Sequence, residues 1–226
     1  MAEKVIYYQC DKCGQVEPES RWIRGPNGSS SCLHCGSHSS DRKWPSAEVS
    51  EFIAFIRNYD TSVREYGQVA SVFLSSVLEL MFEQLLATMA YMDLTYDDAG
   101  LLVDALLEGY QGRSRMFALY KRIGYSNFHS AVRELGYGDF IKHWEEIVLA
   151  RNGIVHGDLR KGDKVTPDLI NKTIDEALAV FSQLHNLYNT ESLEYKAWTE
   201  RKRRLAEELS KLRKWTKSVD DASEFE

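Results

Sequence analysis

All four cysteines of this 226-residue chain lie near its N-terminus, in two Cys-x-x-Cys pairs. The pairs are Cys10 with Cys13 and Cys32 with Cys35, and 18 residues separate them. Each such turn directs two thiolates toward one point, so two turns complete the tetrahedral sulfur cage that suits zinc. Because four thiolates close the coordination shell, the spacing predicts one structural zinc ion per chain rather than a catalytic one.

The residues around these cysteines are typical of metal-binding knuckles. Gly14 and Gly36 each follow the second cysteine of a pair, where a tight turn is needed and glycine adopts it without strain. His34 and His38 lie close enough to replace a thiolate, although four cysteines already make a full set of ligands. A disulfide is disfavoured because cytosolic thiols stay reduced, and an iron–sulfur cluster is a further alternative. The pattern resembles a zinc ribbon over residues 5–40.

A second set of reactive side chains lies in the segment Arg151-Asn152-Gly153-Ile154-Val155-His156-Gly157. Cleavage of RNA through its own 2′-hydroxyl needs a base, an acid and positive charge near the phosphate. The imidazole of His156 can perform either proton transfer near neutral pH, and the guanidinium of Arg151 can hold phosphate oxygens through paired donors. Asn152 is expected to orient the cleft or to contact the phosphate.

The spacing of Arg151 and His156 also argues for two chains. Positions five apart on a regular helix lie about 140° from each other, so the two side chains should meet on one phosphate only if Gly153 distorts the helix. A two-fold axis near the segment would bring two copies of each residue into one cleft. We therefore expect a composite site at a homodimer interface.

A purely structural account of the same segment is also open. In that account Arg151 pairs with Glu145 or Glu146 on the surface. His156 then caps the C-terminus of its helix, and Gly157 turns the chain. The remaining histidines of the helical region are each isolated on a predicted helix and are expected at the surface or at an interface: His129, His143 and His185.

The elements that must position these residues follow from three regions of different composition. Residues 1–45 hold all the cysteines and three of the four prolines, which predicts short strands and turns. Residues 46–190 have no proline between Pro45 and Pro167, and their apolar residues recur at helical spacing, which predicts a helical domain. Residues 191–226 are predicted to form a basic amphipathic helix with an acidic tail. The expected fold class is mainly α, with a small β-rich N-terminal ribbon.

Within the helical domain, apolar periodicity and glycine breaks predict helices at residues 62–92, 97–108, 113–123 and 128–135. A further helix is expected from about Asp139 to Gly157, and another begins with Thr166 as its N-cap and Pro167 in its first turn. Residues 69–90 are apolar enough to span a membrane, but Glu79 and Glu83 near the middle of that window indicate a buried helix.

The helical domain resembles the HEPN superfamily, whose members carry an Arg-x4-6-His motif with a polar residue after the arginine. Arg151, Asn152 and His156 match that motif, and Phe140-x3-Trp144-x2-Ile147-Val148 precedes it. The core of the family would cover residues 50–189.

Many HEPN members also place an acidic residue on an early helix that faces the motif. Glu79 is similar to that residue, and Glu83, one turn later, is the alternative. The resemblance implies a metal-independent endoribonuclease that works as a homodimer, with Arg151, Asn152, His156 and Glu79 in its active site. Relatives of this kind usually act as growth-arresting toxins or antiphage defence effectors, which implies an antitoxin or another regulatory protein as a partner.

Two other functions remain open at this stage. HEPN-like domains also occur as non-catalytic nucleotide- or RNA-binding modules. In the other alternative, the ribbon recruits another macromolecule, so that the chain serves as a partner-binding protein. A formal net charge of −6 favours solubility but predicts no general attraction for RNA.

The basic residues that the chain does have are concentrated near its C-terminus. Residues 196–217 contain nine Lys or Arg against three Glu, a net charge of +6 that leaves −12 on the rest of the chain. The run Arg201-Lys202-Arg203-Arg204 is either a contact for the RNA backbone or one face of a solvated helix. The first residues lack the apolar core of a signal peptide, which predicts a cytoplasmic protein with no membrane partner.

Overall fold

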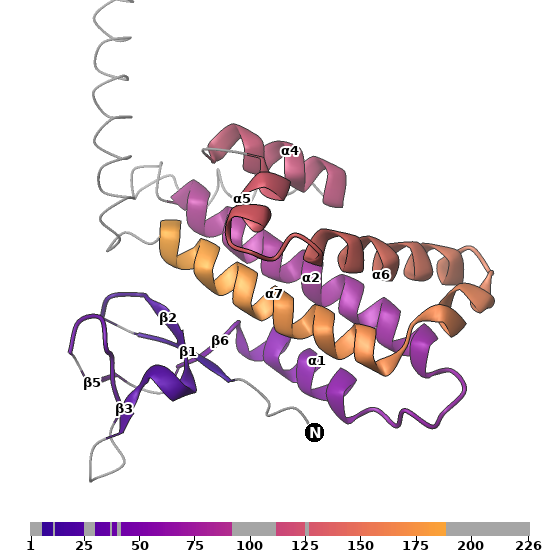
Figure 1. The fold of residues 1–226 in the computed structure, drawn as a ribbon, viewed down its shortest axis with the longest axis horizontal. Coiled ribbons are helices and arrows are strands. Elements are labelled where there is room, and N and C mark those ends of the chain that lie inside the picture. Colours follow the sequence, from indigo (N-terminus) through magenta and orange to yellow (C-terminus); the bar gives the residue numbers. More distant parts are fainter. Residues whose placement is uncertain are drawn as a thin grey trace, which may run out of the picture.

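The computed structural model describes residues 6–10, 12–24, 30–36, 38–39, 42–91, 112–124 and 127–188. The chain is mainly helical, with a small region of short strands near the N-terminus (Figure 1). The predicted helix at residues 97–108 and the predicted basic helix at residues 191–226 lie outside the described residues.

The strand region consists of two small antiparallel sheets. The first has the order β2-β1-β6 and the second the order β3-β4-β5. Their strands are β1 (Tyr7–Gln9), β2 (Val16–Pro18), β3 (Ile23–Arg24), β4 (Ser30–Ser31), β5 (His38–Ser39) and β6 (Arg42–Trp44), and a short 3-10 turn, η1 (Glu19–Arg21), follows β2. Because β6 pairs with β1, the last strand before the helices closes the sheet that carries the first cysteine pair.

The helices form a single packed body, which we call the helical body. Its elements are α1 (Ala47–Asn58), α2 (Tyr66–Tyr91), α4 (Arg113–Ile123), α5 (Phe128–Glu134), α6 (Phe140–Val155), the 3-10 helix η2 (Leu159–Lys164) and α7 (Pro167–Tyr188). The predicted helices from α4 to α7 agree with these bounds to within two residues at each end where a bound was predicted. Thr166 caps α7 as expected, because its hydroxyl accepts a hydrogen bond from the backbone N–H of Leu169 at 3.2 Å.

The sequence analysis missed helix α1. Its buried residues Val49, Ile53 and Ile56 have the spacing of one helix face, so the signal was present immediately after Pro45. The helix packs against α2, which is the longest element of the body.

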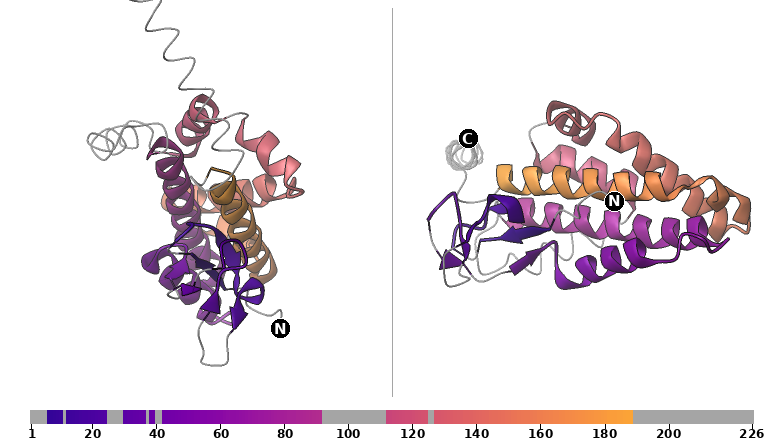
Figure 2. Two further views of the ribbon diagram at one scale, coloured as in Figure 1. Left: turned by 90° about the vertical axis from the view of Figure 1, so that its left-hand side faces the viewer. Right: turned by 60° about the horizontal axis from the view of Figure 1, so that its bottom comes forward.

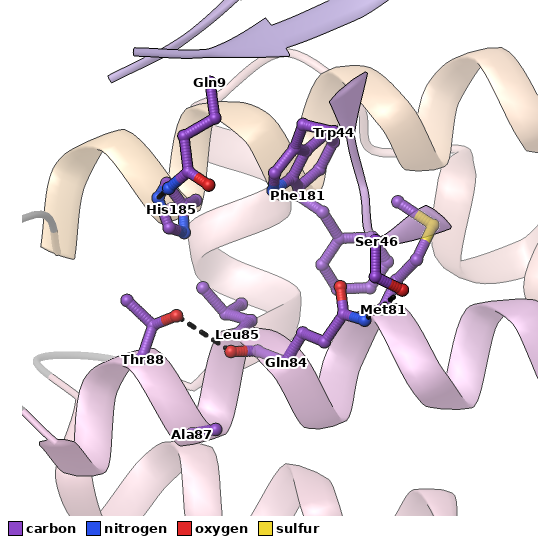
Figure 3. Close-up of a pocket in the computed structure, with 10 residues that line it drawn as sticks. All are labelled: Gln9, Trp44, Ser46, Met81, Gln84, Leu85, Ala87, Thr88, Phe181 and His185. Atoms are coloured by element: carbon purple, nitrogen blue, oxygen red, sulfur yellow. Dashed lines mark hydrogen bonds between the residues drawn. The ribbon is translucent and has the colours of Figure 1, made fainter. Parts of the chain in front are cut away.

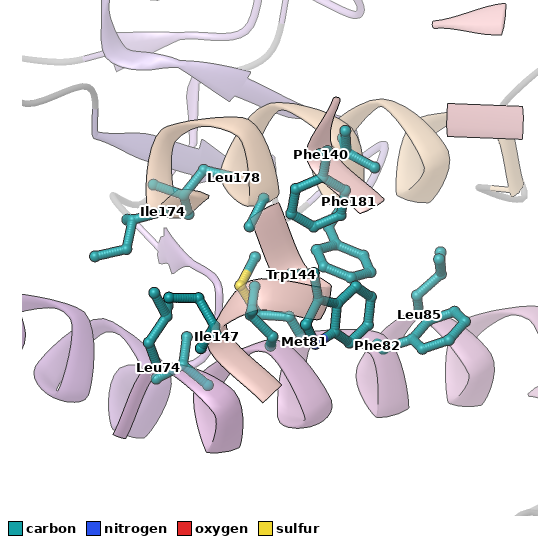
Figure 4. Close-up of a cluster of buried hydrophobic side chains, with 14 of the residues drawn as sticks. Leu74, Met81, Phe82, Leu85, Phe140, Trp144, Ile147, Ile174, Leu178 and Phe181 are labelled. Atoms are coloured by element: carbon teal, nitrogen blue, oxygen red, sulfur yellow. The ribbon is translucent and has the colours of Figure 1, made fainter. Parts of the chain in front are cut away.

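Helix α2 runs through the centre of the helical body and packs against α1, α4, α6 and α7. Its length and hydropathy would allow it to cross a membrane, but 56% of its most apolar window is buried inside this body. Aromatic rings fill the core beside it: Phe82 of α2 lies 4.5 Å from Phe128 and 5.7 Å from Trp144, measured between ring centroids. Figure 4 shows the core side chains gathered between α2, α6 and α7. The helix is apolar because it is surrounded by other helices.

Two glycines hold η2 tightly against the start of α2. A Cβ atom on Gly67 would lie 2.2 Å from the carbonyl oxygen of Gly162, and one on Gly162 would lie 2.6 Å from the side chain of Gln68. No other residue type allows such an approach of two backbones. The contact fixes the segment that follows α6, and with it the position of Arg151 and His156.

The strand region and the α6–η2–α7 turn lie at opposite ends of the helical body (Figures 1 and 2). The two groups of reactive residues singled out in the sequence therefore belong to different ends of the molecule.

Candidate functional sites

The four cysteines converge on one point, as their spacing predicts. Their sulfur atoms all lie within 4.8 Å of one another. Cys10 Sγ lies 3.7 Å from Cys35 Sγ, and Cys13 Sγ lies 3.7 Å from Cys32 Sγ. These separations are far longer than the bond of about 2.05 Å in a disulfide. The cluster could therefore hold a metal ion.

The backbone on each side of the cluster folds as a knuckle. The N–H of Gly14 donates to the carbonyl of Cys10 at 2.8 Å, and the N–H of Gly36 donates to the carbonyl of Cys32 at the same distance. Both glycines have left-handed backbone angles, with φ of 70° and 69°, which residues with a Cβ adopt at a cost. The predicted role of the two glycines is confirmed.

Burial of the cysteine cluster favours binding of a cation. It raises the pKa of the thiols of Cys13 and Cys32 above the usual value, because a thiolate is poorly solvated there. A bound metal reverses this penalty, since it supplies the positive charge that the thiolates lack. His34 is exposed and stands outside the cluster formed by the described residues, whereas nothing is described of the side chain of His38.

The strand region is fastened to α7 by side chains of that helix. The amide of Asn186 accepts from the N–H of Val16 and donates to its carbonyl, both at 2.7 Å. One side chain thus pairs with the free edge of β2 as a neighbouring strand would. His185 directly precedes Asn186, and its Nε2 lies 3.2 Å from both the carbonyl of Gly14 and Nε2 of Gln9. Burial lowers the pKa of His185, and the contact with Gly14 only partly opposes this effect, so the imidazole is neutral at neutral pH.

Arg151 and His156 lie at the opposite end of the molecule, where α6 ends. Arg151 is half-buried, and its Nη1 donates to Oδ1 of the adjacent Asn152 at 3.0 Å. Within the described residues it forms no ion pair with Glu145 or Glu146, and Glu145 pairs instead with Arg113 at 3.8 Å. The structural account in which Arg151 pairs with one of these two carboxylates is therefore wrong. A guanidinium with only an amide partner keeps donors available for an anion.

His156 is exposed and is the C-cap residue of α6. Its backbone N–H donates to the carbonyl of Asn152, and the next residue, Gly157, turns the chain with φ of 90°. This part of the structural account is confirmed. Capping uses only the backbone of His156. Its imidazole forms no hydrogen bond within the described part of the chain.

Gly153 does not distort the helix that carries Arg151 and His156. Helix α6 continues through it to Val155, so the motif stays on a helix until its last residue. A Cβ atom at this position would lie 2.3 Å from Cγ of Lys161. The glycine therefore admits the side chain of Lys161 from η2 against the motif helix.

This packing identifies a basic group that the sequence analysis did not single out. Arg160, Lys161 and Lys164 are all exposed on η2, directly after the motif. Arg160 is held only by a neighbour, Oδ1 of Asp158, at 3.3 Å on the surface. Their closeness in sequence to His156 was a usable signal, but only the contact between Gly153 and Lys161 shows that η2 folds back on α6.

Exposed apolar side chains flank the motif. Leu149, Val155 and Leu159 leave 66%, 60% and 53% of their surface exposed. Arg151 and Val155 are one turn apart on α6, as are Leu149 and Asn152. Arg151 and Asn152 therefore each have an exposed apolar neighbour on their own side of the helix.

The remaining predicted residues are spread over the helical body. Glu79 is half-buried on α2, and no hydrogen bond or ion pair joins it to the motif within the described residues. His143 bonds to Glu176 of α7 at 2.7 Å, and His185 contacts the strand region, so both are interface residues as expected. His129 is exposed on α5. The run Arg201-Lys202-Arg203-Arg204 lies outside the described residues.

Comparison of this chain with protein families, with curated proteins and with solved structures finds no match.

Proposed function

We propose that this protein is a metal-independent endoribonuclease of the HEPN type that works as a homodimer. The observation that carries the proposal is the end of α6, where, among the described residues, the imidazole of His156 has no partner and the guanidinium of Arg151 has only the side chain of Asn152 as a partner. These are the groups needed to move a proton from the 2′-hydroxyl and to hold the phosphate. The Arg-x4-His pattern of the family adds to that chemistry.

The basic side chains of η2 extend this surface. Lys161 lies against Gly153, between Arg151 and His156 in the sequence, so its charge adds to theirs. A local group of cations is needed, because the whole chain carries a net charge of −6 and does not attract RNA in general. In this proposal Lys161 binds the RNA backbone, while Arg151 and His156 act at the reacting phosphate.

A second copy of the chain would complete the site. One chain supplies one imidazole for two proton transfers, and a two-fold axis near α6 supplies the other. The exposed Leu149, Val155 and Leu159 give such a contact an apolar core around the polar residues. The dimer would thus bury these side chains and bring two His156 residues to one cleft.

The proposed metal at the cysteine cluster is zinc. Two pairs of sulfur atoms lie 3.7 Å apart, and in a regular tetrahedron with that edge the metal–sulfur bonds would be about 2.3 Å, the length of zinc–thiolate bonds. A set of thiolates without oxygen ligands does not suit magnesium or calcium. With four protein ligands no position stays open for substrate, so the ion would hold the two knuckles together rather than act on RNA.

The test is RNA cleavage by the purified, full-length chain in the presence of a chelator that does not strip the cysteine cluster. We expect cleavage of mixed RNA to products with 2′,3′-cyclic phosphate ends, which follow from attack by the 2′-hydroxyl. His156→Ala and Arg151→Ala should each lower the rate about 10²- to 10⁴-fold. Products are measured by gel electrophoresis and mass spectrometry.

Matched controls are available on α5, away from the motif. His129 and Arg133 are both exposed there, and His129→Ala and Arg133→Ala should cleave RNA as the unmodified chain does. Equal cleavage by the His156→Ala variant would contradict the proposal. Intact RNA in every sample would favour the binding-module alternative. The suggested role as a toxin or antiphage effector depends on the nuclease activity.

A further inference from the structure

A cavity lies between the strand region and the helical body, far from the motif of α6. Its volume is about 420 Å³, within the range of about 300–1,000 Å³ that is typical of small-molecule sites. It faces Met81 to Thr88 of α2, whereas η2 and the motif segment lie beside Gly67. At 1.5 Å per residue, the intervening 14 residues of α2 amount to about 20 Å. The cavity is therefore separate from the proposed nuclease site.

Three segments that are distant in sequence form the walls of this cavity. The strand side contributes Gln9 and Trp44, and Ser46 follows β6. The opposite wall is α2, and α7 supplies the rest (Figure 3). Figure 3 shows His185 and Gln9 on one side of the space and Gln84 with Thr88 on the other. The described residues that line it are Gln9, Trp44, Ser46, Met81, Gln84, Leu85, Ala87, Thr88, Phe181 and His185.

None of the ten described residues that line the cavity is Asp, Glu, Lys or Arg. A phosphate, a carboxylate or an ammonium group inside the cavity would lose its hydration without gaining an opposite charge. The occupant must therefore be uncharged at the part that enters. Its faces must also be apolar, because Met81, Leu85 and Phe181 form much of the wall.

Several polar atoms of the lining have hydrogen-bonding capacity that the described residues do not use. The amide of Gln84 donates to Oγ of Ser46 at 3.0 Å, and its carbonyl oxygen has no partner among the described residues. The amide nitrogen of Gln9 donates to the carbonyl of Gly14 at 3.2 Å, and its carbonyl oxygen likewise has no described partner. The indole N–H of Trp44 and Nδ1 of His185 also have no partner within the described part of the chain. The cavity thus offers acceptors and a donor from opposite walls.

Such a lining fits a flat, uncharged ring with hydrogen-bond donors and acceptors along its edge. We propose that this cavity binds a nucleobase, with the sugar and any phosphate left outside. Nucleobases combine apolar faces with an amide-like edge, so they match the glutamine side chains and the indole of Trp44. The base could be part of a free nucleoside or an unpaired base of single-stranded RNA, and the same chemistry recognises both.

The test is isothermal titration of the full-length, metal-loaded chain with adenosine, guanosine, cytidine and uridine. We expect at least one nucleoside to bind, and its 5′-monophosphate to bind within about threefold of it, with little effect of salt because none of the described lining residues is Asp, Glu, Lys or Arg. Ribose 5-phosphate should not bind. Nucleosides contain no phosphodiester, so the result does not depend on whether the chain cleaves RNA.

Two variants place the binding in the cavity. Gln84→Met removes the amide but keeps the shape, and Ala87→Phe fills the space; each should weaken nucleoside binding at least tenfold. Gln183→Met makes the same replacement on the exposed face of α7 and should bind as the unmodified chain does. Far-ultraviolet circular dichroism and metal content establish that each variant is folded.

The outcomes are distinct. Failure of all four nucleosides to bind, or undiminished binding by Ala87→Phe, would overturn the proposal. Binding of ribose 5-phosphate as strong as that of the nucleotides would overturn it too, because it would show a phosphate site. A competition experiment then identifies the source: displacement of the nucleoside by a short single-stranded RNA assigns the base to RNA, and displacement by free nucleosides alone assigns it to a small molecule.

Discussion

The two ends of this molecule hold their reactive residues in opposite ways. At the strand end, four thiols converge within 4.8 Å of one another, and three of them are buried. At the far end of the helical body, Arg151 and His156 lie on the surface of one helix terminus. The four thiols face one another within one chain. The side chains of Arg151 and His156 instead lie at the surface.

In the proposed function, this difference separates a structural role from a catalytic one. A closed cluster leaves no position for substrate, so its contribution is stability of the fold. An open group contributes little to the fold, because exposed side chains have few contacts to lose. Variants at the two ends should therefore affect different measurements.

The largest effect is expected from loss of a thiol. Cys10→Ser or Cys32→Ser should release the proposed zinc ion and unfold residues 1–45, because structural zinc binding contributes about 10–16 kcal/mol in small domains. Metal analysis should fall from about one zinc per chain to near zero, and limited proteolysis should cut within that region. His34→Ala is the matched control and should keep its metal. A native sample that contains iron or no metal would contradict the prediction.

The next effect concerns the apolar residues around the motif. Leu149→Asp or Val155→Asp places a charge where the proposed dimer buries an apolar side chain, so dimers should dissociate and RNA cleavage should fall at least tenfold, since a desolvated unpaired charge costs several kcal/mol. Sedimentation measures the first and cleavage assays the second. Phe52→Asp, at another exposed apolar residue on α1, should change neither. Cleavage at the full rate by a monomer would remove the reason for a composite site.

The smallest effect is expected where the two regions are joined. Asn186→Ala removes both hydrogen bonds to the backbone of Val16, which should lower the free energy of unfolding by about 1–3 kcal/mol. The amide of Val16 should then exchange with deuterium faster, as measured by mass spectrometry or NMR. Gln183→Ala, on the exposed face of the same helix, should leave that exchange rate unchanged. An unchanged rate in Asn186→Ala would show that the strand region is held by other contacts.

Much of the fold follows from local patterns in the sequence. Pro167 and the cap at Thr166 mark the start of α7, and the glycines at 124 and 136 mark the ends of neighbouring helices. These signals work because capping and backbone preference act within a few residues. Helix α1 was missed although Val49, Ile53 and Ile56 lie on one face of it, since a single short helix after a proline has few other markers.

Such local patterns do not predict contacts between segments that are distant in the sequence. The fit of Lys161 against Gly153 depends on how η2 folds back over α6. The pairing of Asn186 with Val16 joins residues that are 170 positions apart. Nothing in the local sequence distinguishes these residues from their neighbours, so each becomes recognisable only when the partner is in place.

The sequence by itself determined the cysteine cluster, because the spacing of Cys-x-x-Cys turns fixes the direction of the thiols before any helix packs. It also determined the identity of the imidazole and guanidinium at the end of α6. Only the tertiary structure decided which carboxylate pairs with Arg113 and leaves Arg151 without one. It alone created the uncharged cavity between Trp44, Gln84 and His185, because such a space exists only where strands and helices from separate parts of the chain are packed together.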